Sequence, residues 1–442
     1  MGTGLPGRTG SAVNPHEDGA REAAVSNRGW TVTFAGTGIN LALGILYTWS
    51  MFKGAIEKEF GWQGSRLNDP FVLCCLVFAA AMIFAGRCQD KFGPRLTASI
   101  GGLLVGAGFV LCSTTTNYGI WLLGFGVLAG IGIGFGYSSA TPPALKWFPP
   151  SKTGLIAGLV VAGFGLAPVY LAPVSQYLLG QFQVQKSMLI LGIAFVVIVC
   201  GLAQWLRNPP AGYVAAVKSA SGTAPAKPVQ TNATPGEILR QPKFWLLWVI
   251  YFVGSGAGLM VISSIGPMAK KSMGELAFVA VAVMAIGNAG GRIIAGTLSD
   301  KIGRRWTLML VLLVQAALMF AAIPLIASKD MAGLVIVLVA ALIGANYGAN
   351  LALFPSYTKD LWGLRSFGVN YGILFTAWGM GGLVLPRVQQ MLTARTGGSY
   401  TSSFITAGVM LLFGAALTLL LRARPAESPM PVPAPAIVGT AK

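Results

Sequence analysis

The stretch Gly86-Arg-Cys-Gln-Asp90-Lys-Phe-Gly-Pro-Arg95 recurs 210 residues later as Gly296-Thr-Leu-Ser-Asp300-Lys-Ile-Gly-Arg-Arg305, and this repeat decides the fold. Each copy is a compact charged turn between two long apolar segments. Glycine permits the bend, an aspartate can cap a neighbouring helix N-terminus, and the basic residues face the negative surface of a membrane. Because each copy follows the second apolar segment of its half, we interpret the chain as two repeats.

Twelve apolar segments surround the two turns. The chain of 442 residues is 54% hydrophobic and only 10% charged, whereas a soluble domain has roughly 25% charged residues. Segments of about 20 apolar residues can cross a bilayer, and unpaired backbone groups in lipid force each segment to be helical. The sequence therefore predicts an all-α polytopic membrane protein with transmembrane helices near 30–52, 68–88, 95–113, 118–145, 151–178, 185–206, 244–268, 275–297, 306–327, 331–356, 366–393 and 401–422.

Positive charge is distributed unevenly over the predicted loops. The net charge is +18, and roughly two thirds of the 31 Lys and Arg residues fall on one side when both termini are placed in the cytoplasm. The basic excess is therefore explained by topology, and we expect contact with membrane lipid and none with nucleic acid. The predicted location is the cell membrane, which the chain crosses many times.

The distribution of Pro, Ser, Thr and charged residues predicts the domain boundaries. A segment that begins at Pro235 and leads to Trp245 is expected to contain a short surface helix before the second half. The predicted parts are a disordered cytoplasmic tail over 1–27, a six-helix bundle over 28–206, a cytoplasmic linker over 207–240, a second six-helix bundle over 241–424, and a disordered tail over 425–442.

Arg292 is the strongest candidate for a functional residue. It lies about two turns inside an apolar segment, and an ionised side chain in hydrocarbon costs at least a few kcal/mol, so it normally faces a cavity. Asn288, one turn before it, either orients the guanidinium or contacts substrate. The alternative is a purely structural role, in which the buried arginine binds helix carbonyl groups.

Aromatic residues are predicted at the depth of Arg292. With a rise of about 1.5 Å per residue, Tyr47, Tyr137 and Tyr347 reach the same level as Arg292, which leans toward the middle of the bilayer. Trp378 and Phe375 lie at the centre of their helix, and Leu351 is assigned to the same site. A guanidinium with neutral phenol donors and aromatic walls suits a small carboxylate, although aromatic residues in membranes mostly serve packing.

Acidic residues and histidine are placed so that no side chain is an obvious proton carrier within the membrane. All thirteen acidic residues fall in tails, loops or helix ends, and the single histidine is His16. A transported proton would travel with the substrate or balance Arg292 when the site is empty; otherwise the cycle is exchange or uniport. The five cysteines lack metal-ligand spacing and no nucleophile–base set is present, so we expect no enzyme activity, no metal and no cofactor.

The repeated turn resembles the G-x-x-x-D-[RK]-x-G-R-R loop of the major facilitator superfamily, and the resemblance covers all twelve helices. It implies the major facilitator fold, with a conformational role for Asp90, Arg95, Asp300 and Arg304. Within this superfamily the chain is similar to the oxalate/formate antiporter family and the related monocarboxylate transporters. The stretches that carry this similarity are Leu46-Tyr-Thr-Trp-Ser50, Asp90-Lys-Phe-Gly-Pro-Arg95, Lys146-Trp-Phe-Pro149, Gln241-Pro-Lys-Phe-Trp245, Gly291-Arg292, Ala352-Leu-Phe-Pro-Ser356 and Asn370-Tyr-Gly372.

The resemblance implies that Arg292 binds the substrate carboxylate. Trp378 stands where the oxalate exchangers have a lysine, so a single fixed charge remains and a monoanion is favoured. We therefore predict a proton-coupled transporter of lactate-like or pyruvate-like monocarboxylates that works by alternating access. An oxalate:formate or other small carboxylate exchanger is the first alternative, and a membrane sensor that binds carboxylates without transport is the second.

Overall fold

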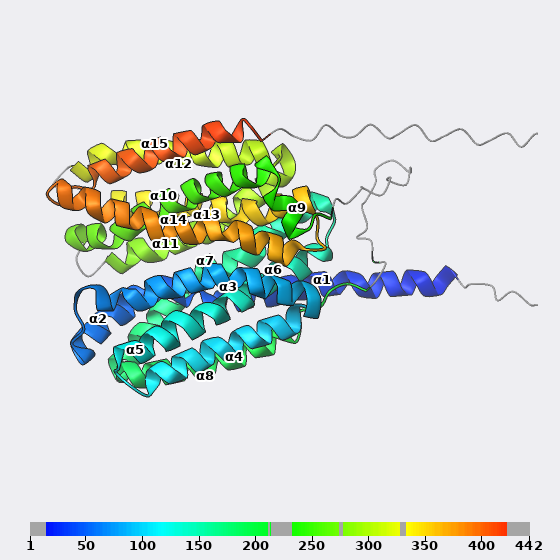
Figure 1. The fold of residues 1–442 in the computed structure, drawn as a ribbon, viewed down its shortest axis with the longest axis horizontal. Coiled ribbons are helices and arrows are strands. Elements are labelled where there is room, and N and C mark those ends of the chain that lie inside the picture. Colours follow the sequence, from blue (N-terminus) through cyan, green and yellow to red (C-terminus); the bar gives the residue numbers. More distant parts are fainter. Residues whose placement is uncertain (1–14, 211–212, 214–231, 274–276, 328–332, 422–442) are drawn as a thin grey trace, which may run out of the picture.

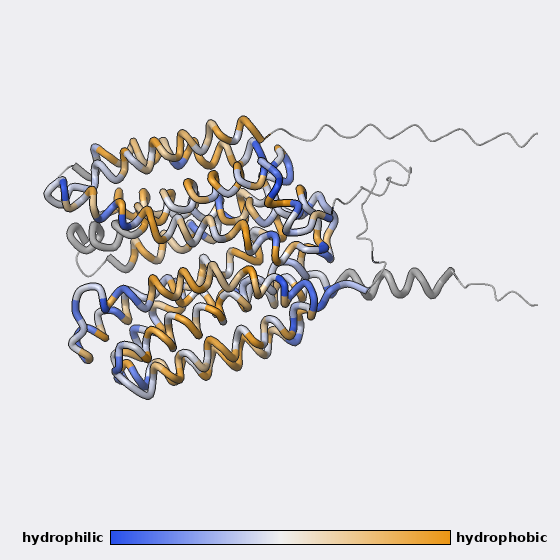
Figure 2. The backbone as a smooth tube through the Cα atoms, viewed as in Figure 1, coloured by the Kyte–Doolittle hydropathy of each residue, from blue (hydrophilic) through white to orange (hydrophobic). Residues whose placement is uncertain are grey.

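Two bundles of six long helices lie side by side in the computed structural model, which describes residues 15–210, 213, 232–273, 277–327 and 333–421 (Figure 1). For residues 15–27, 263–273, 277–278, 325–327 and 333 it describes the backbone alone. Within these ranges twelve helices are long and apolar enough to cross a membrane. Hydrophilic residues gather at the two ends of the bundle (Figure 2). The predicted all-α polytopic fold is confirmed.

The first half has two interrupted crossings. A 3₁₀ turn, η1, divides the first crossing, and a π-helical stretch, η3, lies in the fourth; such irregular turns inside helices frequently mark functional sites. The elements are α1 (Pro15–Leu43), η1 (Gly44–Thr48), α2 (Trp49–Phe60), η2 (Gly64–Leu67), α3 (Asp69–Phe92), α4 (Pro94–Ser113), α5 (Tyr118–Trp121), η3 (Leu122–Ala129), α6 (Gly130–Lys146), η4 (Pro150–Lys152), α7 (Thr153–Gln181) and α8 (Val184–Ala203).

The second half begins with a short surface helix, α9, as the sequence predicts. The Thr234 backbone N–H donates to Glu237 Oε2 at 2.7 Å, which closes a capping box and lowers the pKa of the Glu237 carboxyl. The elements are α9 (Pro235–Leu239), α10 (Pro242–Met273), α11 (Ala277–Ile302), α12 (Arg304–Ala327), α13 (Gly333–Trp362), α14 (Phe367–Arg395) and α15 (Thr401–Thr418).

The N-terminal boundary differs from the predicted one. Helix α1 already begins at Pro15, so the backbone of residues 15–27 is helical and not part of a disordered tail. Proline is favoured in the first turn of a helix, and the Ala and Glu residues that follow Pro15 are strong helix formers. The rest of that tail, most of the predicted linker and the tail 425–442 lie outside the described residues.

The two halves meet mainly through two pairs of helices, α7 with α11 and α3 with α14, and α7 also contacts α13. Glycines allow the backbones to touch: a Cβ atom built on Gly296 would lie 2.2 Å from the Gly154 carbonyl oxygen, and one built on Gly86 would lie 2.2 Å from the Gly368 backbone. Both contacts are at the end of the bundle that carries α9, called the α9 end below. The sequence predicts this end to be cytoplasmic.

Candidate functional site

Arg292 lies near the middle of the span Val279–Ile302 and is fully buried. Its Nε donates to Asn288 Oδ1 at 2.9 Å, and its Nη1 donates to the carbonyl oxygen of Val161 on α7. Its Nη2 has no partner. The guanidinium therefore joins the two halves and keeps one charged donor free. The bond to the Val161 carbonyl oxygen is the purely structural contact that the sequence analysis gives as the alternative to substrate binding.

Two glycines on α7 bring its backbone close to Arg292. A Cβ atom on Gly158 would lie 2.5 Å from the Arg292 carbonyl oxygen, and one on Gly165 would lie 2.9 Å from Asn288 Oδ1. A distance below 3.0 Å forces a neighbouring atom to shift: the backbone of α11 in the case of Gly158, and the Asn288 side chain that holds Arg292 in the case of Gly165. The small side of α7 is therefore the reason why a carbonyl group of the first half can reach a guanidinium of the second.

Three of the predicted residues form a chain of polar contacts across the two halves. Trp378 Nε1 on α14 donates to the Tyr347 hydroxyl on α13 at 2.8 Å. The Tyr347 hydroxyl in turn lies 3.5 Å from the Tyr47 hydroxyl, which η1 contributes from the first half. These groups are therefore largely satisfied by one another in this arrangement.

The predicted aromatic residues lie in one continuous layer. Phe375 is 5.0 Å from Trp378 and 5.5 Å from Tyr137 between ring centroids. Tyr137 also interacts electrostatically with Arg292, which connects the layer to the cation. Leu351, the last predicted residue, is buried on α13 one turn after Tyr347.

Four further aromatic residues belong to this layer and were not assigned from the sequence. Phe78 on α3 lies 5.1 Å from Phe375, and Phe164 on α7 lies 5.4 Å from Tyr137. Tyr251 on α10 and Tyr371 on α14 also face Phe375. Tyr371 lies in the stretch Asn370-Tyr-Gly372 that carries the family resemblance, so the sequence contained an indication of its role. For Tyr251 the sequence contained no indication other than the presence of a phenol in an apolar helix.

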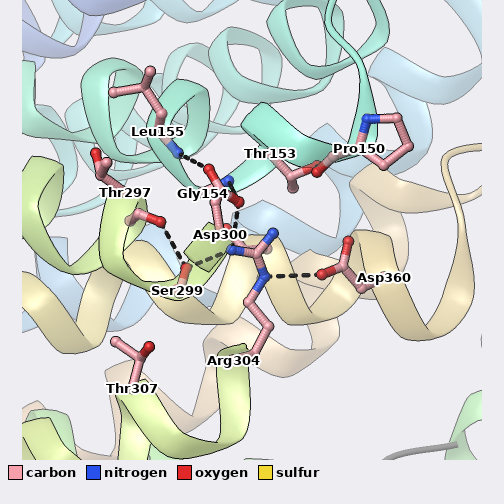
Figure 3. A network of polar contacts seen from close by, with 12 residues as sticks. Pro150, Thr153, Gly154, Leu155, Thr297, Ser299, Asp300, Arg304, Thr307 and Asp360 are labelled. Carbon is pink, nitrogen blue, oxygen red and sulfur yellow. Dashed lines mark hydrogen bonds and ion pairs between the residues drawn. The ribbon is translucent and has the colours of Figure 1, made fainter. Parts of the chain in front are cut away.

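The aspartates of the repeated turns bind the opposite half. Asp300 accepts hydrogen bonds from the backbone N–H groups of Gly154 and Leu155 at 2.8 and 2.9 Å, at the N-terminus of α7 (Figure 3). Asp90 accepts from the N–H groups of Gly368 and Val369 at 3.0 and 3.1 Å, at the N-terminus of α14. A carboxylate at a helix N-terminus is stabilised by the unpaired N–H groups and by the helix dipole. Both contacts join the two halves at the α9 end.

The arginines of the two turns play different structural parts. Arg304 joins Asp300 at 2.7 Å and Asp360 at 2.8 Å and also donates to Ser299 (Figure 3). Arg95 donates from Nε to the carbonyl oxygen of Leu206 at 3.1 Å, at the end of α8. It matches Arg305, which binds the carbonyl groups that end α15. Pro94 occupies the position that corresponds to Arg304, so among the described residues these ion pairs form at the second turn and not at the first.

The pocket that the structure shows lies away from the predicted residues. No group of three His, Cys, Asp or Glu residues could hold a metal ion in the part of the chain that the structure describes. A pocket of about 460 Å³ opens at the opposite end of the bundle from α9, and it contains none of the predicted residues. It is lined by Gln389, Gln390, Thr393, Ala394, Gly398 and Tyr400.

Comparison with known proteins decides the family. The sequence matches the Major Facilitator Superfamily over residues 30–386 and 272–439. The chain belongs to the major facilitator superfamily. This major facilitator is 32% identical to YhjX of Escherichia coli strain K12, an uncharacterized MFS-type transporter, over 80% of this chain and 85% of that protein.

Other relatives of this major facilitator have names that state a substrate. The oxalate:formate antiporter of Oxalobacter formigenes is 28% identical over 83% of this chain and 85% of its own length. Human monocarboxylate transporter 11 is 26% identical over 91% and 84%. The structure of FucP in its outward conformation has a TM-score of 0.65 at 14% identity and covers 89% of this chain and 99% of that one, which shows the shared fold. The prediction that the chain is a multi-pass membrane transporter rather than an enzyme is confirmed.

Proposed function

We propose that this major facilitator carries small organic monocarboxylates of the lactate and pyruvate type together with a proton. The observation that carries the proposal is the free Nη2 of the buried Arg292. A carboxylate is the natural partner for a free guanidinium N–H group, because its oxygens accept charge-assisted hydrogen bonds. Two relatives whose names state oxalate, formate or monocarboxylate as substrate support the same class.

The charge balance of the site favours a monoanion. Among the described residues no carboxylate forms an ion pair with Arg292. A single negative charge on the substrate therefore neutralises the site, whereas a dianion leaves one charge unpaired in an apolar environment. Trp378, where the oxalate exchangers have a lysine, adds an indole instead of a second cation. The proton travels together with the substrate anion, because no described carboxylate pairs with Arg292.

Alternating access would use the contacts of the repeated turns. In this part of the proposal Asp90 and Asp300 hold the α9 end closed, Arg304 strengthens the Asp300 contact, and Arg95 fixes its turn to α8. Release of both aspartates lets the bundles rock apart at this end. Arg292 then becomes accessible from the α9 end.

A panel of radiolabelled acids tests the proposal directly. The purified chain is reconstituted in proteoliposomes, and counterflow of lactate, pyruvate, formate, acetate and oxalate is measured with and without a pH gradient. We expect counterflow of the 2-substituted monocarboxylates, and accumulation driven by an inward proton gradient. Strong oxalate:formate exchange without a response to pH would support the exchanger instead. Binding without any flux would support a sensor.

Charge matching predicts the effect of Trp378→Lys. The new ammonium would add a second cation beside Phe375, and oxalate counterflow should rise at least about tenfold over that of Trp378→Met, because a dianion then finds two partners. Trp378→Met is the matched control, since it also removes the indole that binds Tyr347 and adds no charge. Equal oxalate transport by the two variants would contradict the argument from charge.

A further inference from the structure

Two buried tyrosines near Arg292 have hydroxyl groups that complete no hydrogen bond of normal geometry. Tyr251 is fully buried and Tyr371 is 3% exposed. Both hydroxyl oxygens are enclosed without a partner, as is Nη2 of Arg292. An unpaired polar group in an apolar interior costs about 1–3 kcal/mol. Three unpaired donors in one region therefore indicate a site that a polar ligand completes.

The two phenols lie together on one side of the aromatic layer. Their ring centroids are 6.2 Å (Tyr251) and 5.8 Å (Tyr371) from that of Phe375, and Tyr137 approaches the same ring from the first half at 5.5 Å. The Tyr371 hydroxyl interacts with those of Tyr137 and Tyr251 both electrostatically and as a hydrogen-bonding neighbour, although neither contact reaches normal hydrogen-bond geometry. Tyr251 interacts with Arg292 as well. Both phenols therefore belong to the aromatic layer that also contacts the guanidinium, Tyr251 by its own interaction with Arg292 and Tyr371 through Tyr137.

Packing, and not hydrogen bonding, fixes the Tyr251 ring. It is stacked on Phe354 with a centroid distance of 3.8 Å and an interplanar angle of 12°. Tyr47 and Tyr347, by contrast, have hydroxyls that face each other, and Tyr347 also accepts from Trp378. The layer thus contains one set of phenols that form hydrogen bonds of normal geometry within the protein. The hydroxyls of the other set, Tyr251 and Tyr371, approach one another without completing such a bond.

We propose that Tyr251 and Tyr371 recognise an oxygen on the carbon next to the substrate carboxylate, so that the transporter selects 2-hydroxy and 2-oxo monocarboxylates over unsubstituted acids. This rests on the proposed carboxylate site at Arg292. A phenol O–H donates to either a hydroxyl or a keto oxygen. An unsubstituted acid leaves both donors unpaired, and a site built to bind a substrate oxygen discriminates against an analogue that lacks it. Two such bonds give a preference of roughly 10- to 100-fold.

L-lactate and propionate provide the test, because both have three carbons and they differ by one hydroxyl group. Counterflow efficiency of each acid is measured for the full chain in proteoliposomes. Wild type should prefer lactate by roughly 10- to 100-fold. Tyr251→Phe and Tyr371→Phe should each lower the lactate-to-propionate ratio by roughly 3- to 10-fold through a loss of lactate transport, with propionate transport near the wild-type level.

Tyr170→Phe is the matched control, because the Tyr170 hydroxyl donates to the Leu41 carbonyl oxygen at 3.1 Å within the first half. It should leave the ratio unchanged, whatever its effect on the total rate, as would any purely structural change. An unchanged ratio in both Tyr251→Phe and Tyr371→Phe overturns this inference, and the proposed function still stands if Arg292→Lys weakens transport of both acids. If Arg292→Lys transports both acids as wild type does, the proposed function itself is overturned.

Discussion

Arg292→Lys is expected to weaken the binding of monocarboxylates by roughly 30- to 150-fold. The substitution keeps one positive charge but removes the planar guanidinium, so the charge-assisted hydrogen bonding that we propose between Nη2 and the carboxylate is lost. Charge-assisted hydrogen bonds contribute about 2–3 kcal/mol here, which corresponds to that change in affinity. The lysine also lacks an Nε–H group with which to keep the bond to Asn288. The concentration dependence of counterflow in proteoliposomes measures the effect as a rise in KM.

Arg305→Lys is a suitable control for this experiment. Arg305 also donates to helix carbonyl groups, those of Thr418 and Leu419, but it does so at the α9 end, away from the proposed binding site. It should leave the KM for lactate within about twofold of wild type. Unchanged kinetics in Arg292→Lys would mean that the guanidinium serves only to join α11 to the Val161 carbonyl group and does not bind a carboxylate.

Gly296→Ala is expected to block the closed arrangement of the α9 end. The added Cβ would lie 2.2 Å from the Gly154 carbonyl oxygen and 2.8 Å from its carbonyl carbon, and neither backbone can move away without separating α7 from α11. Overpacking of this kind costs about 2 kcal/mol, so the closed population should fall roughly thirtyfold. Transport should fall by at least about tenfold, because the cycle requires both states.

Spin labels at Lys152→Cys and Lys301→Cys, in a background without the native cysteines, measure this opening as a distance distribution. Both positions are exposed, one in η4 and one at the end of α11. Gly290→Ala is the matched control on the same helix, since a Cβ there meets nothing within 4 Å. A distance distribution in Gly296→Ala that equals that of Gly290→Ala would show that the α7–α11 contact does not control the closed state.

The positions of the repeated turns could be predicted from the sequence, but their partners could not. The spacing of 210 residues placed Asp90 and Asp300 at equivalent points of two repeats. That each aspartate caps a helix of the other half depends on how the two bundles dock, which no local pattern encodes. For the same reason the different contacts of Arg95, with the Leu206 carbonyl group, and of Arg304, with Asp300, could be assigned only from the tertiary structure.

Arg292 and Asn288 illustrate what a local pattern can carry. They are four residues apart on one helix, so their contact follows from helix geometry and was among the predicted alternatives. The depth of Tyr47, Tyr137 and Tyr347 was likewise available from counting residues along each helix. The rotation of each helix about its axis could not be obtained in this way. Tyr251 and Tyr371 were therefore not assigned to the site, although they lie in the same layer.

The sequence by itself determined that the chain crosses a membrane twelve times as two repeats, because hydrocarbon requires long apolar helices and a buried charge within them is costly. Only the tertiary structure decided which phenols are tied to each other and which stand unpaired beside the guanidinium. The physical reason is that the satisfaction of a hydrogen bond depends on the mutual rotation and approach of helices from both halves. Those are set by glycine contacts between segments more than a hundred residues apart.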